Sequence, residues 1–261
     1  MDKTPLFSII IPTFNVENVI SACLGSILNQ TFLDYEVLIQ DGFSTDSTVA
    51  IATALNNDRI KIFVEKDAGV YDAMNKAITN AKGSYIYFLG SDDVLFNNNV
   101  LEILAQELVD LKCDFIYGNV QLTSNLAVVD EVFSKLKLLT EKNICHQAIF
   151  YKKTIFEQLG NFNLNYKIWA DWDLNIRCFS HPNFKIKHVN TTVAIYNDET
   201  GVSAAHDKEF ITLLPLNSRF STTLRSSLNT LGNYLTFTDL LYIGYTKLTN
   251  IVHRVFKLKK S

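Results

Sequence analysis

The sequence predicts an α/β protein in which helices cover both faces of a mostly parallel central sheet, followed by a helical tail. Three observations support this fold class. Short apolar, β-branched runs alternate with amphipathic helical segments through the first half of the chain. Polar loops follow these runs, as they follow the strands of open α/β sheets. The chain has 261 residues, 48% of them hydrophobic, which is enough to bury a large core.

The first half is expected to contain four strands and four helices in alternation. Phe7–Ile11 is a β-branched run ended by Pro12, a pattern typical of a strand buried on both faces. Asn18–Gln30 follows with its apolar residues on one helical face. Asp46 can cap the next helix, Ser47–Leu55. The remaining strands are predicted at Tyr35–Gln40, Ile60–Glu65 and Tyr85–Leu89, and the remaining helices at Val70–Ala81 and Asn99–Leu111.

The second half is less regular, and its elements are predicted to be shorter. Strands are expected at Asp114–Val120, Ala127–Phe133, Ala148–Tyr151 and Val189–Tyr196, and helices at Lys152–Leu159 and Asp171–Cys178. After Asp207 the pattern becomes helical, ending in a helix at Thr238–Leu258. No linker or repeat divides the chain. We therefore expect one domain over residues 1–206 and a helical extension over 207–261.

Composition excludes several classes of protein. The net charge of −3 argues against a nucleic-acid binder. No apolar run reaches the ~18–20 residues of a membrane-spanning helix, and the N-terminus lacks the pattern of a signal peptide. The four cysteines lie far apart, which favours free thiols in a reducing compartment over disulfides or a zinc site; they are Cys23, Cys113, Cys145 and Cys178. A cytoplasmic protein is expected.

Three polar loops follow predicted strands: Pro12–Glu17, Asp41–Thr48 and Gly90–Phe96. Ligands of open α/β sheets bind outside the carboxyl ends of the strands, so these loops should converge at one edge. The third loop contains the pair Asp92 and Asp93. Two adjacent carboxylates need a counter-charge, and Mg²⁺ or Mn²⁺ would supply it while bridging the phosphates of a nucleotide. The alternative is that they only cap the following helix.

Four segments extend this pattern. They are Phe7–Asn15 (FSIIIPTFN), Asp41–Thr48 (DGFSTDST), Gly69–Lys76 (GVYDAMNK) and Phe88–Asp93 (FLGSDD). Their succession resembles the family 2 glycosyltransferases, over about residues 6–205. The resemblance implies the GT-A fold, a Rossmann-like three-layer α/β/α sandwich. It also implies a nucleotide-sugar half at about residues 1–118 and an acceptor half at about 119–206.

The resemblance assigns roles to individual residues. Those matching the nucleotide-sugar site are Pro12, Thr13, Phe14, Asp41, Asp72, Asn75 and Lys76. Asp41 is implied to meet the nucleoside, and Gly42 stands where many relatives have a second carboxylate. Lys76 either contacts phosphate or is a helix-surface cation. Asp92 and Asp93 match the acidic end of the family's D-x-D-like motif, with Asp93 implied as the direct metal ligand.

A second cluster, Trp169–Arg177 (WADWDLNIR), contains Asp171 between two tryptophans and Asp173 directly after the second one. Indoles can stack on sugar rings, so Trp169 and Trp172 fit an acceptor site. The resemblance implies that Asp171 removes the proton from the acceptor hydroxyl. Asp173 remains a rival for this role, and a helix cap with core tryptophans is the structural alternative.

Two histidines and the tail complete the candidates. His146 and His206 lie in regions where related enzymes place polar residues beside the diphosphate or acceptor. From residue 240 to 261 there are five basic residues and no acid. A basic amphipathic helix here either lies on an anionic membrane surface or packs on its own domain or in a homodimer.

These observations predict a metal-dependent, inverting glycosyltransferase of the hexosyltransferase class. It would move a sugar from a nucleotide diphosphate donor, UDP-linked by expectation, to a glycan or lipid-linked acceptor, in bacterial surface polysaccharide biosynthesis. The expected location is cytoplasmic, with peripheral binding at the inner face of the membrane as an added expectation. The alternatives are a nucleotidyltransferase on a similar fold and a non-catalytic nucleotide- or sugar-binding relative.

Overall fold

The structure is a computed structural model that describes residues 4–199. The predicted extension at 207–261, its basic segment and the candidate His206 lie outside the described residues. The elements follow one another as β1 (Phe7–Thr13), α1 (Ile20–Leu28), β2 (Tyr35–Asp41), α2 (Thr48–Ala54), β3 (Ile60–Val64), α3 (Val70–Asn80), β4 (Tyr85–Phe88), β5 (Val94–Leu95), α4 (Val100–Leu111), β6 (Phe115–Leu122), β7 (Val128–Val129), α5 (Lys135–Thr140), the 3₁₀ helix η1 (His146–Ala148), β8 (Ile149–Lys152), α6 (Thr154–Leu159), α7 (Ala170–Ser180) and β9 (Ile186–Tyr196).

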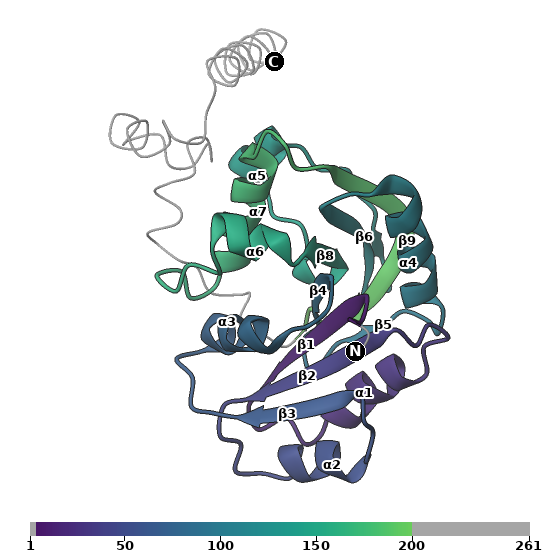
Figure 1. Ribbon diagram of the computed structural model, residues 1–261, viewed down its shortest axis with the longest axis vertical. Helices are drawn as coiled ribbons and strands as arrows, with labels where there is room; N and C mark the ends of the chain where they lie inside the picture. Colours follow the sequence, from purple (N-terminus) through teal and green to yellow (C-terminus); the bar gives the residue numbers. More distant parts are fainter. Residues whose placement is uncertain (1–3, 200–261) are drawn as a thin grey trace, which may run out of the picture.

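One twisted sheet runs through both halves of the described chain (Figure 1). Its strand order is β3-β2-β1-β4-β8-β6-β9-β5, and β7 pairs with β6. β3, β2, β1 and β4 are parallel, as predicted. β8 is antiparallel to both β4 and β6, so the sheet becomes mixed in its second half. Because β8 is antiparallel to both of its neighbours, β6 and its parallel neighbour β9 again run in the direction of β1. The short strands β5 and β7 are antiparallel to β9 and β6.

Helices cover both faces of the sheet, as the three-layer prediction requires. In β1, Ile9 and Ile11 pack in a core with α1 and α4, whereas Ile10 packs in a second core with α3 and α7. β2 repeats the pattern, with Val37 on the first face and Leu38 on the second. Successive side chains of a strand point to opposite faces, so burial on both faces accounts for the unbroken apolar runs.

Several short elements differ from the prediction. The strand expected at Ala127–Phe133 is wrong beyond β7, because the chain leaves the sheet after Val129. The backbone N–H of Phe133 instead donates to the hydroxyl of Tyr117 (2.8 Å). α5, which the sequence analysis did not predict, begins directly afterwards, and Ser134 caps it by accepting from the N–H of Lys137 (3.2 Å).

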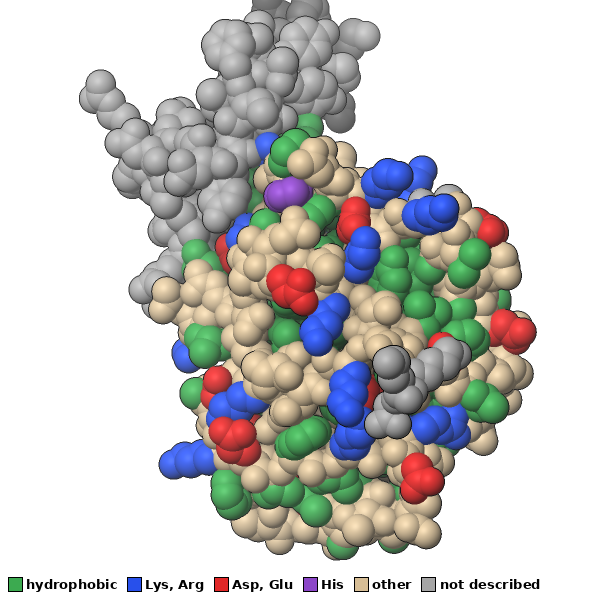
Figure 2. Space-filling view, in the orientation of Figure 1, with side chains coloured by type: hydrophobic (Ala, Val, Ile, Leu, Met, Phe, Trp, Pro, Cys, Tyr) green, Lys and Arg blue, Asp and Glu red, His purple; other side chains and the backbone are tan. Residues whose placement is uncertain are grey.

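The surface and the thiols of the described part are ordinary for a globular protein. Basic and acidic side chains are interspersed over the face in Figure 2, with no large area of one sign. Within residues 4–199, no helix is both long enough and apolar enough to cross a bilayer. The four cysteines are free thiols, as predicted.

Candidate active site

A cleft of about 730 Å³ lies at the edge of the sheet where β1, β4, β6 and β9 end. Both halves of the described chain line it. Of the predicted site residues, those in its wall are Pro12, Asp92, Asp93, His146, Trp169, Asp171 and Trp172. The topology explains this convergence, because β6 and β9 run parallel to β1 and bring their carboxyl ends to the same edge.

Asp41 orders the loops after β1 and β2. Its carboxylate is fully buried and accepts hydrogen bonds from the Thr13 hydroxyl (2.8 Å) and from the N–H and hydroxyl of Ser44 (2.7 and 2.6 Å). Asn15 and Phe43 in these loops have left-handed backbones, with φ of 54° and 68°. Such conformations persist where surrounding contacts hold them. Asp41 was expected to meet the nucleoside; the structure places it beneath the loops, with both oxygens engaged.

Asp67 brings a second carboxylate to these loops, and sequence reasoning missed it. A Cβ atom at Gly42 would lie 2.6 Å from Oδ2 of Asp67 and 3.5 Å from the ring of Phe14. Glycine at position 42 therefore leaves room for the Asp67 side chain. Phe14 itself is 62% exposed. An exposed ring beside a carboxylate is a suitable surface for a nucleobase, which stacks with one face and donates hydrogen bonds from its edge.

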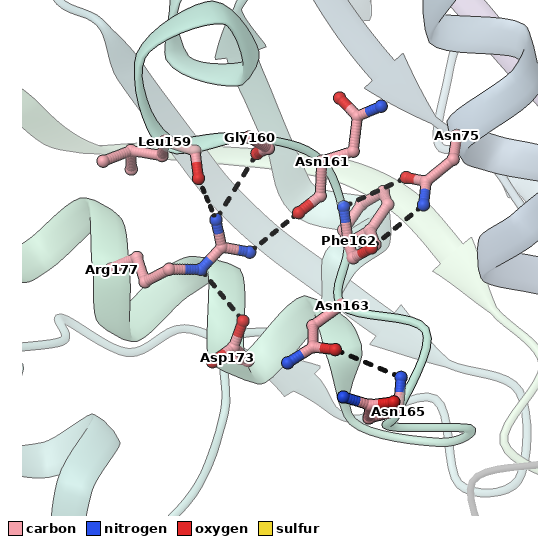
Figure 3. Close-up of polar contacts among 9 residues, drawn as sticks. All are labelled: Asn75, Leu159, Gly160, Asn161, Phe162, Asn163, Asn165, Asp173 and Arg177. Atoms are coloured by element: carbon pink, nitrogen blue, oxygen red, sulfur yellow. Dashed lines mark hydrogen bonds and ion pairs between the residues drawn. The ribbon is translucent and has the colours of Figure 1, made fainter. Parts of the chain in front are cut away.

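Asp72, Asn75 and Lys76 lie on α3 but are not among the residues lining the main cleft. The amide of Asn75 donates to the carbonyl of Phe162 (2.9 Å) and accepts from its N–H (3.0 Å), as Figure 3 shows. The ammonium of Lys76 pairs with Glu65 (3.1 Å) and Asp72 (3.5 Å), which raises the pKa of Lys76, chiefly through the hydrogen bond with Glu65. Lys76 is thus a paired helix cation in this structure.

Asp92 and Asp93 have different environments. Asp93 is 1% exposed, and its oxygens accept from the Gln147 amide (2.7 Å) and from the backbone N–H of Asn197 (2.8 Å). Burial raises the pKa of Asp93, although both hydrogen bonds oppose the shift. Asp92 is exposed and accepts only a longer bond from the Asn197 amide (3.2 Å). The sequence analysis favoured Asp93 as the direct metal ligand; each of its oxygens accepts one hydrogen bond within the protein, and the side chain is almost fully buried, whereas Asp92 is the exposed carboxylate of the pair.

Asp171 lies in the cleft wall at the first turn of α7. It is 7% exposed, and the Tyr71 hydroxyl and the Asn143 amide each donate to one of its oxygens, both at 2.7 Å. The carbonyl of Ile168, 2.6 Å from the same Tyr71 hydroxyl, is the other acceptor for its single proton. Burial raises the pKa of Asp171; the charge of His146 and the Tyr71 hydrogen bond lower it. A buried carboxylate with a raised pKa, fixed by two donors in a cleft, has the properties of a general base.

Asp173 is the rival base, and its surroundings are structural. Its carboxylate pairs with Nε of Arg177 at 2.9 Å, and it is not among the residues lining the cleft. The remaining guanidinium nitrogens of Arg177 donate to backbone carbonyls of the loop after α6, including Leu159 (2.7 Å) and Asn161 (2.9 Å). Figure 3 shows this clamp beside the Asn75 contacts. Of the two carboxylates, only Asp171 is placed for proton transfer in the cleft.

The two candidate tryptophans also differ in how deeply they are buried. Trp172 is 7% exposed and its indole N–H donates to the carbonyl of Leu138 (2.8 Å), so most of this side chain belongs to the core. Trp169 is half-buried and meets Trp172 edge to face, with ring centroids 5.6 Å apart. Both line the cleft, as does His146.

The described residues fit a divalent cation shared with a bound diphosphate. Asp92 offers a hard carboxylate at the cleft. In residues 4–199, no group of three or more His, Cys, Asp or Glu side chains is placed to hold an ion. Further ligands would therefore come from phosphate oxygens and water, which Mg²⁺ and Mn²⁺ accept readily.

The family profile described as "Glycosyl transferase family 2" matches residues 8–168. A PGL/p-HBAD biosynthesis glycosyltransferase of Mycobacterium tuberculosis is 43% identical over 220 residues, covering 82% of this chain and 86% of the relative. An Escherichia coli protein, UDP-Glc:alpha-D-GlcNAc-diphosphoundecaprenol beta-1,3-glucosyltransferase WfgD, is 34% identical over 138 residues, 52% of this chain and 54% of that protein.

Two solved structures show the same fold at low sequence identity. Staphylococcus aureus TarS in complex with UDP-GlcNAc has a TM-score of 0.68 at 20% identity, covering 87% of this chain and 73% of its own. The Pyrobaculum calidifontis mannosyltransferase PcManGT, in complex with GDP-Man and Mn²⁺, has a TM-score of 0.64 at 15% identity, covering 96% and 81%. The predicted GT-A fold is confirmed.

Proposed function

The chain belongs to glycosyl transferase family 2, and we propose that it is an inverting, metal-dependent enzyme that uses a nucleotide diphosphate sugar, UDP-linked by preference. One observation carries the proposal. A single cleft brings together an exposed carboxylate suited to a metal–diphosphate, Asp92, and a buried carboxylate suited to proton abstraction, Asp171. Inverting transfer needs both groups, one for the leaving diphosphate and one for the attacking hydroxyl.

The nucleoside would lie over the loops after β1 and β2. Phe14 offers an exposed ring, and Asp67 beside Gly42 offers a carboxylate that can accept from a base N–H. Asp41 supports this surface from below through Thr13 and Ser44. Two proteins of the same fold were crystallised with UDP-GlcNAc and with GDP-Man, which supports a nucleotide sugar as the donor class.

Asp92 would be the protein ligand of Mn²⁺ or Mg²⁺, with Asp93 as the buried residue that holds the motif in place. When bound, the cation supplies positive charge to the departing diphosphate. His146 lines the same cleft as Asp92 and Asp171, and its protonated form would favour the ionised forms of Asp93 and Asp171. It can therefore add positive charge near the leaving group.

Asp171 would take the proton from the acceptor hydroxyl. The hydroxyl oxygen then forms the new bond to the anomeric carbon as the bond to the diphosphate oxygen breaks, and the configuration inverts. The Tyr71 and Asn143 hydrogen bonds fix the orientation of the carboxylate before the acceptor arrives. After the reaction the proton resides on Asp171 and the nucleotide diphosphate leaves.

The acceptor is proposed to be a glycan or lipid-linked molecule of a bacterial surface polysaccharide. The names of two relatives, which refer to PGL/p-HBAD biosynthesis and to a diphosphoundecaprenol substrate, support this class. The basic segment at 240–261, outside the described residues, would then place the enzyme at the inner face of the membrane, although a dimer contact is an alternative use.

The experiment is a donor screen. UDP-, GDP- and dTDP-sugars are incubated with the full chain, and release of nucleotide diphosphate is measured with Mn²⁺, with Mg²⁺ and with EDTA. We expect turnover of a UDP-sugar that requires a divalent cation. Full activity in EDTA would contradict metal dependence, and no turnover of any nucleotide sugar would contradict the donor class.

A further inference from the structure

We infer that the acceptor half of the cleft holds a subsite for an apolar group, so that the acceptor hydroxyl is carried by a molecule with an apolar aglycone. This inference rests on the proposed function and deepens it by naming a class of acceptor. It concerns the wall formed by β6, β7 and the segment that follows them. The proposed donor-binding residues take no part in this wall.

The wall is apolar because of strand geometry. Gly118, Val120 and Leu122 alternate along β6 and line the cleft together; Val120 is 2% exposed, so the partly buried Leu122 offers most of the strand's apolar surface. Val129 on β7 is the cross-strand partner of Val120 and lines the same cleft. Phe133 extends the wall beyond β7. The neighbouring residue Val128 is 47% exposed and is not among the cleft-lining residues.

The acidic residue beside this wall is paired with two lysines. Glu131 lines the cleft, but its carboxylate forms ion pairs with Lys137 and with Lys142, the latter at 2.5 Å. The Tyr117 hydroxyl is likewise engaged, since it accepts from the Phe133 N–H at 2.8 Å.

Glycan hydroxyls placed directly against these apolar side chains would lack hydrogen-bond partners there, and unpaired buried polar groups are costly; the polar residues Lys142, Asn143 and Asn197 line other parts of the cleft. A phenyl or alkyl group would instead bury apolar area there. Asp171 lies in the same cleft, so an acceptor could present its hydroxyl to the base while its apolar part contacts the wall. The observations therefore favour an amphiphilic acceptor over a wholly hydrophilic one.

The test is binding of matched probes to the full chain with UDP present. Methyl and phenyl β-glycosides of glucose, galactose and N-acetylglucosamine are titrated by saturation-transfer NMR. For at least one sugar, the phenyl glycoside should bind about tenfold tighter than the methyl glycoside, a size of effect usual for filling an apolar pocket. Val129→Thr should remove most of this difference and leave methyl glycoside binding unchanged.

Val128→Thr is the matched control, because it makes the same substitution at the neighbouring residue of the same short strand. It should leave both affinities unchanged. Equal binding of phenyl and methyl glycosides for every sugar would overturn the inference, as would equal effects of the two variants. Release of nucleotide diphosphate from a nucleotide-sugar donor is measured in separate samples of the same protein preparations, without glycoside or added UDP. It reports separately on the proposed function.

Discussion

Asp92 and Asp93 are adjacent in sequence, yet only Asp92 is exposed at the cleft. The fold makes the difference, since Gln147 and Asn197, which follow much later in the chain, each donate to one oxygen of the buried Asp93. Asp171 and Asp173 differ in the same way. One faces the cleft and the other pairs with Arg177.

The first prediction separates the two neighbouring carboxylates. Asp92→Asn should abolish the increase in UDP affinity caused by Mn²⁺ and leave the melting temperature unchanged, because the side chain is exposed. Asp93→Asn should cost about 1–3 kcal/mol of stability, because its amide NH₂ would face a donor in a buried site. Titration calorimetry with and without Mn²⁺ and urea unfolding measure both. Loss of the Mn²⁺ effect in Asp93→Asn alone would return the ligand role to Asp93.

The second prediction concerns pH. Asp171 acts as a base only when ionised, so kcat/KM should fall as pH decreases through its pKa, which burial raises. The Tyr71 hydrogen bond lowers that pKa, so Tyr71→Phe should move the acid limb to higher pH and reduce the rate. Tyr85→Phe is the control, since its hydroxyl donates to the carbonyl of Cys113 (2.7 Å) and Tyr85 is not among the residues lining the cleft. An unchanged acid limb in Tyr71→Phe would exclude Asp171 as the titrating base.

The acidic site residues could be found in the sequence because of where they stand, at the end of a strand or the start of a helix. Their partners could not. Tyr71 is 100 positions before Asp171, and Asn143 is 28 positions before it. These contacts depend on how α3 and the segment before η1 meet α7, which no local pattern specifies. Asp67 was missed for the same reason, because only the tertiary structure places it beside Gly42.

At the scale of elements, the loop after α6 is held from two helices. Arg177 on α7 donates to its carbonyls, and Asn75 on α3 makes two hydrogen bonds with the backbone of Phe162 (Figure 3). The helices α3 and α7 also carry Tyr71 and Asp171, which contact each other. The loop clamp therefore stabilises the helix pair that positions the proposed base.

The third prediction measures this clamp. Arg177→Ala should lower the free energy of unfolding by about 3 kcal/mol, because it leaves Asp173 and several carbonyls without a partner. Both side chains of the ion pair are only 14–15% exposed. Arg177→Lys, which keeps the charge but not the fork of donors, should lose part of this energy. Urea unfolding gives the values, and a loss below 1 kcal/mol for Arg177→Ala would contradict the structural role.

The helices of the first half could be predicted because their apolar residues repeat with the helical period. Its strands could be predicted because they are unbroken apolar runs followed by polar loops. The second half could not be predicted as fully. β7 has two residues and α5 has six, which is too short for either period to be recognised. The antiparallel direction of β8 depends on its pairing with β4 and β6, and that pairing leaves no mark in the four residues of β8 itself.

At the scale of the molecule, one sheet joins the donor-binding and acceptor-binding parts. β8 lies between β4 and β6, so the strands that carry the acidic pair and the apolar wall are held at fixed positions. The cleft therefore belongs to both halves. The resemblance to family 2 enzymes could indicate this division, but only the topology brings Asp171 and Asp92 into one cavity.

The fourth prediction concerns the whole chain at a membrane. Each basic residue near an anionic surface contributes about 1 kcal/mol, a contribution that salt screens. The full chain should sediment with vesicles containing phosphatidylglycerol at low salt and less at high salt. Replacing Lys257, Lys259 and Lys260 with Gln should weaken binding about 10²-fold or more, while donor hydrolysis continues. Binding that ignores both salt and these substitutions would exclude an electrostatic contact through the tail.

Asp171 as the base is the central proposal, and the matched pair Asp171→Asn and Asp173→Asn tests it most directly. Initial rates of sugar transfer and the affinity for the donor are measured for both variants and the unchanged chain. We expect Asp171→Asn to reduce transfer by ~10²-fold or more with donor affinity preserved. Asp173→Asn should stay within a few-fold of the unchanged rate at a temperature where it is folded. Transfer that survives in Asp171→Asn and is lost in Asp173→Asn would contradict the account.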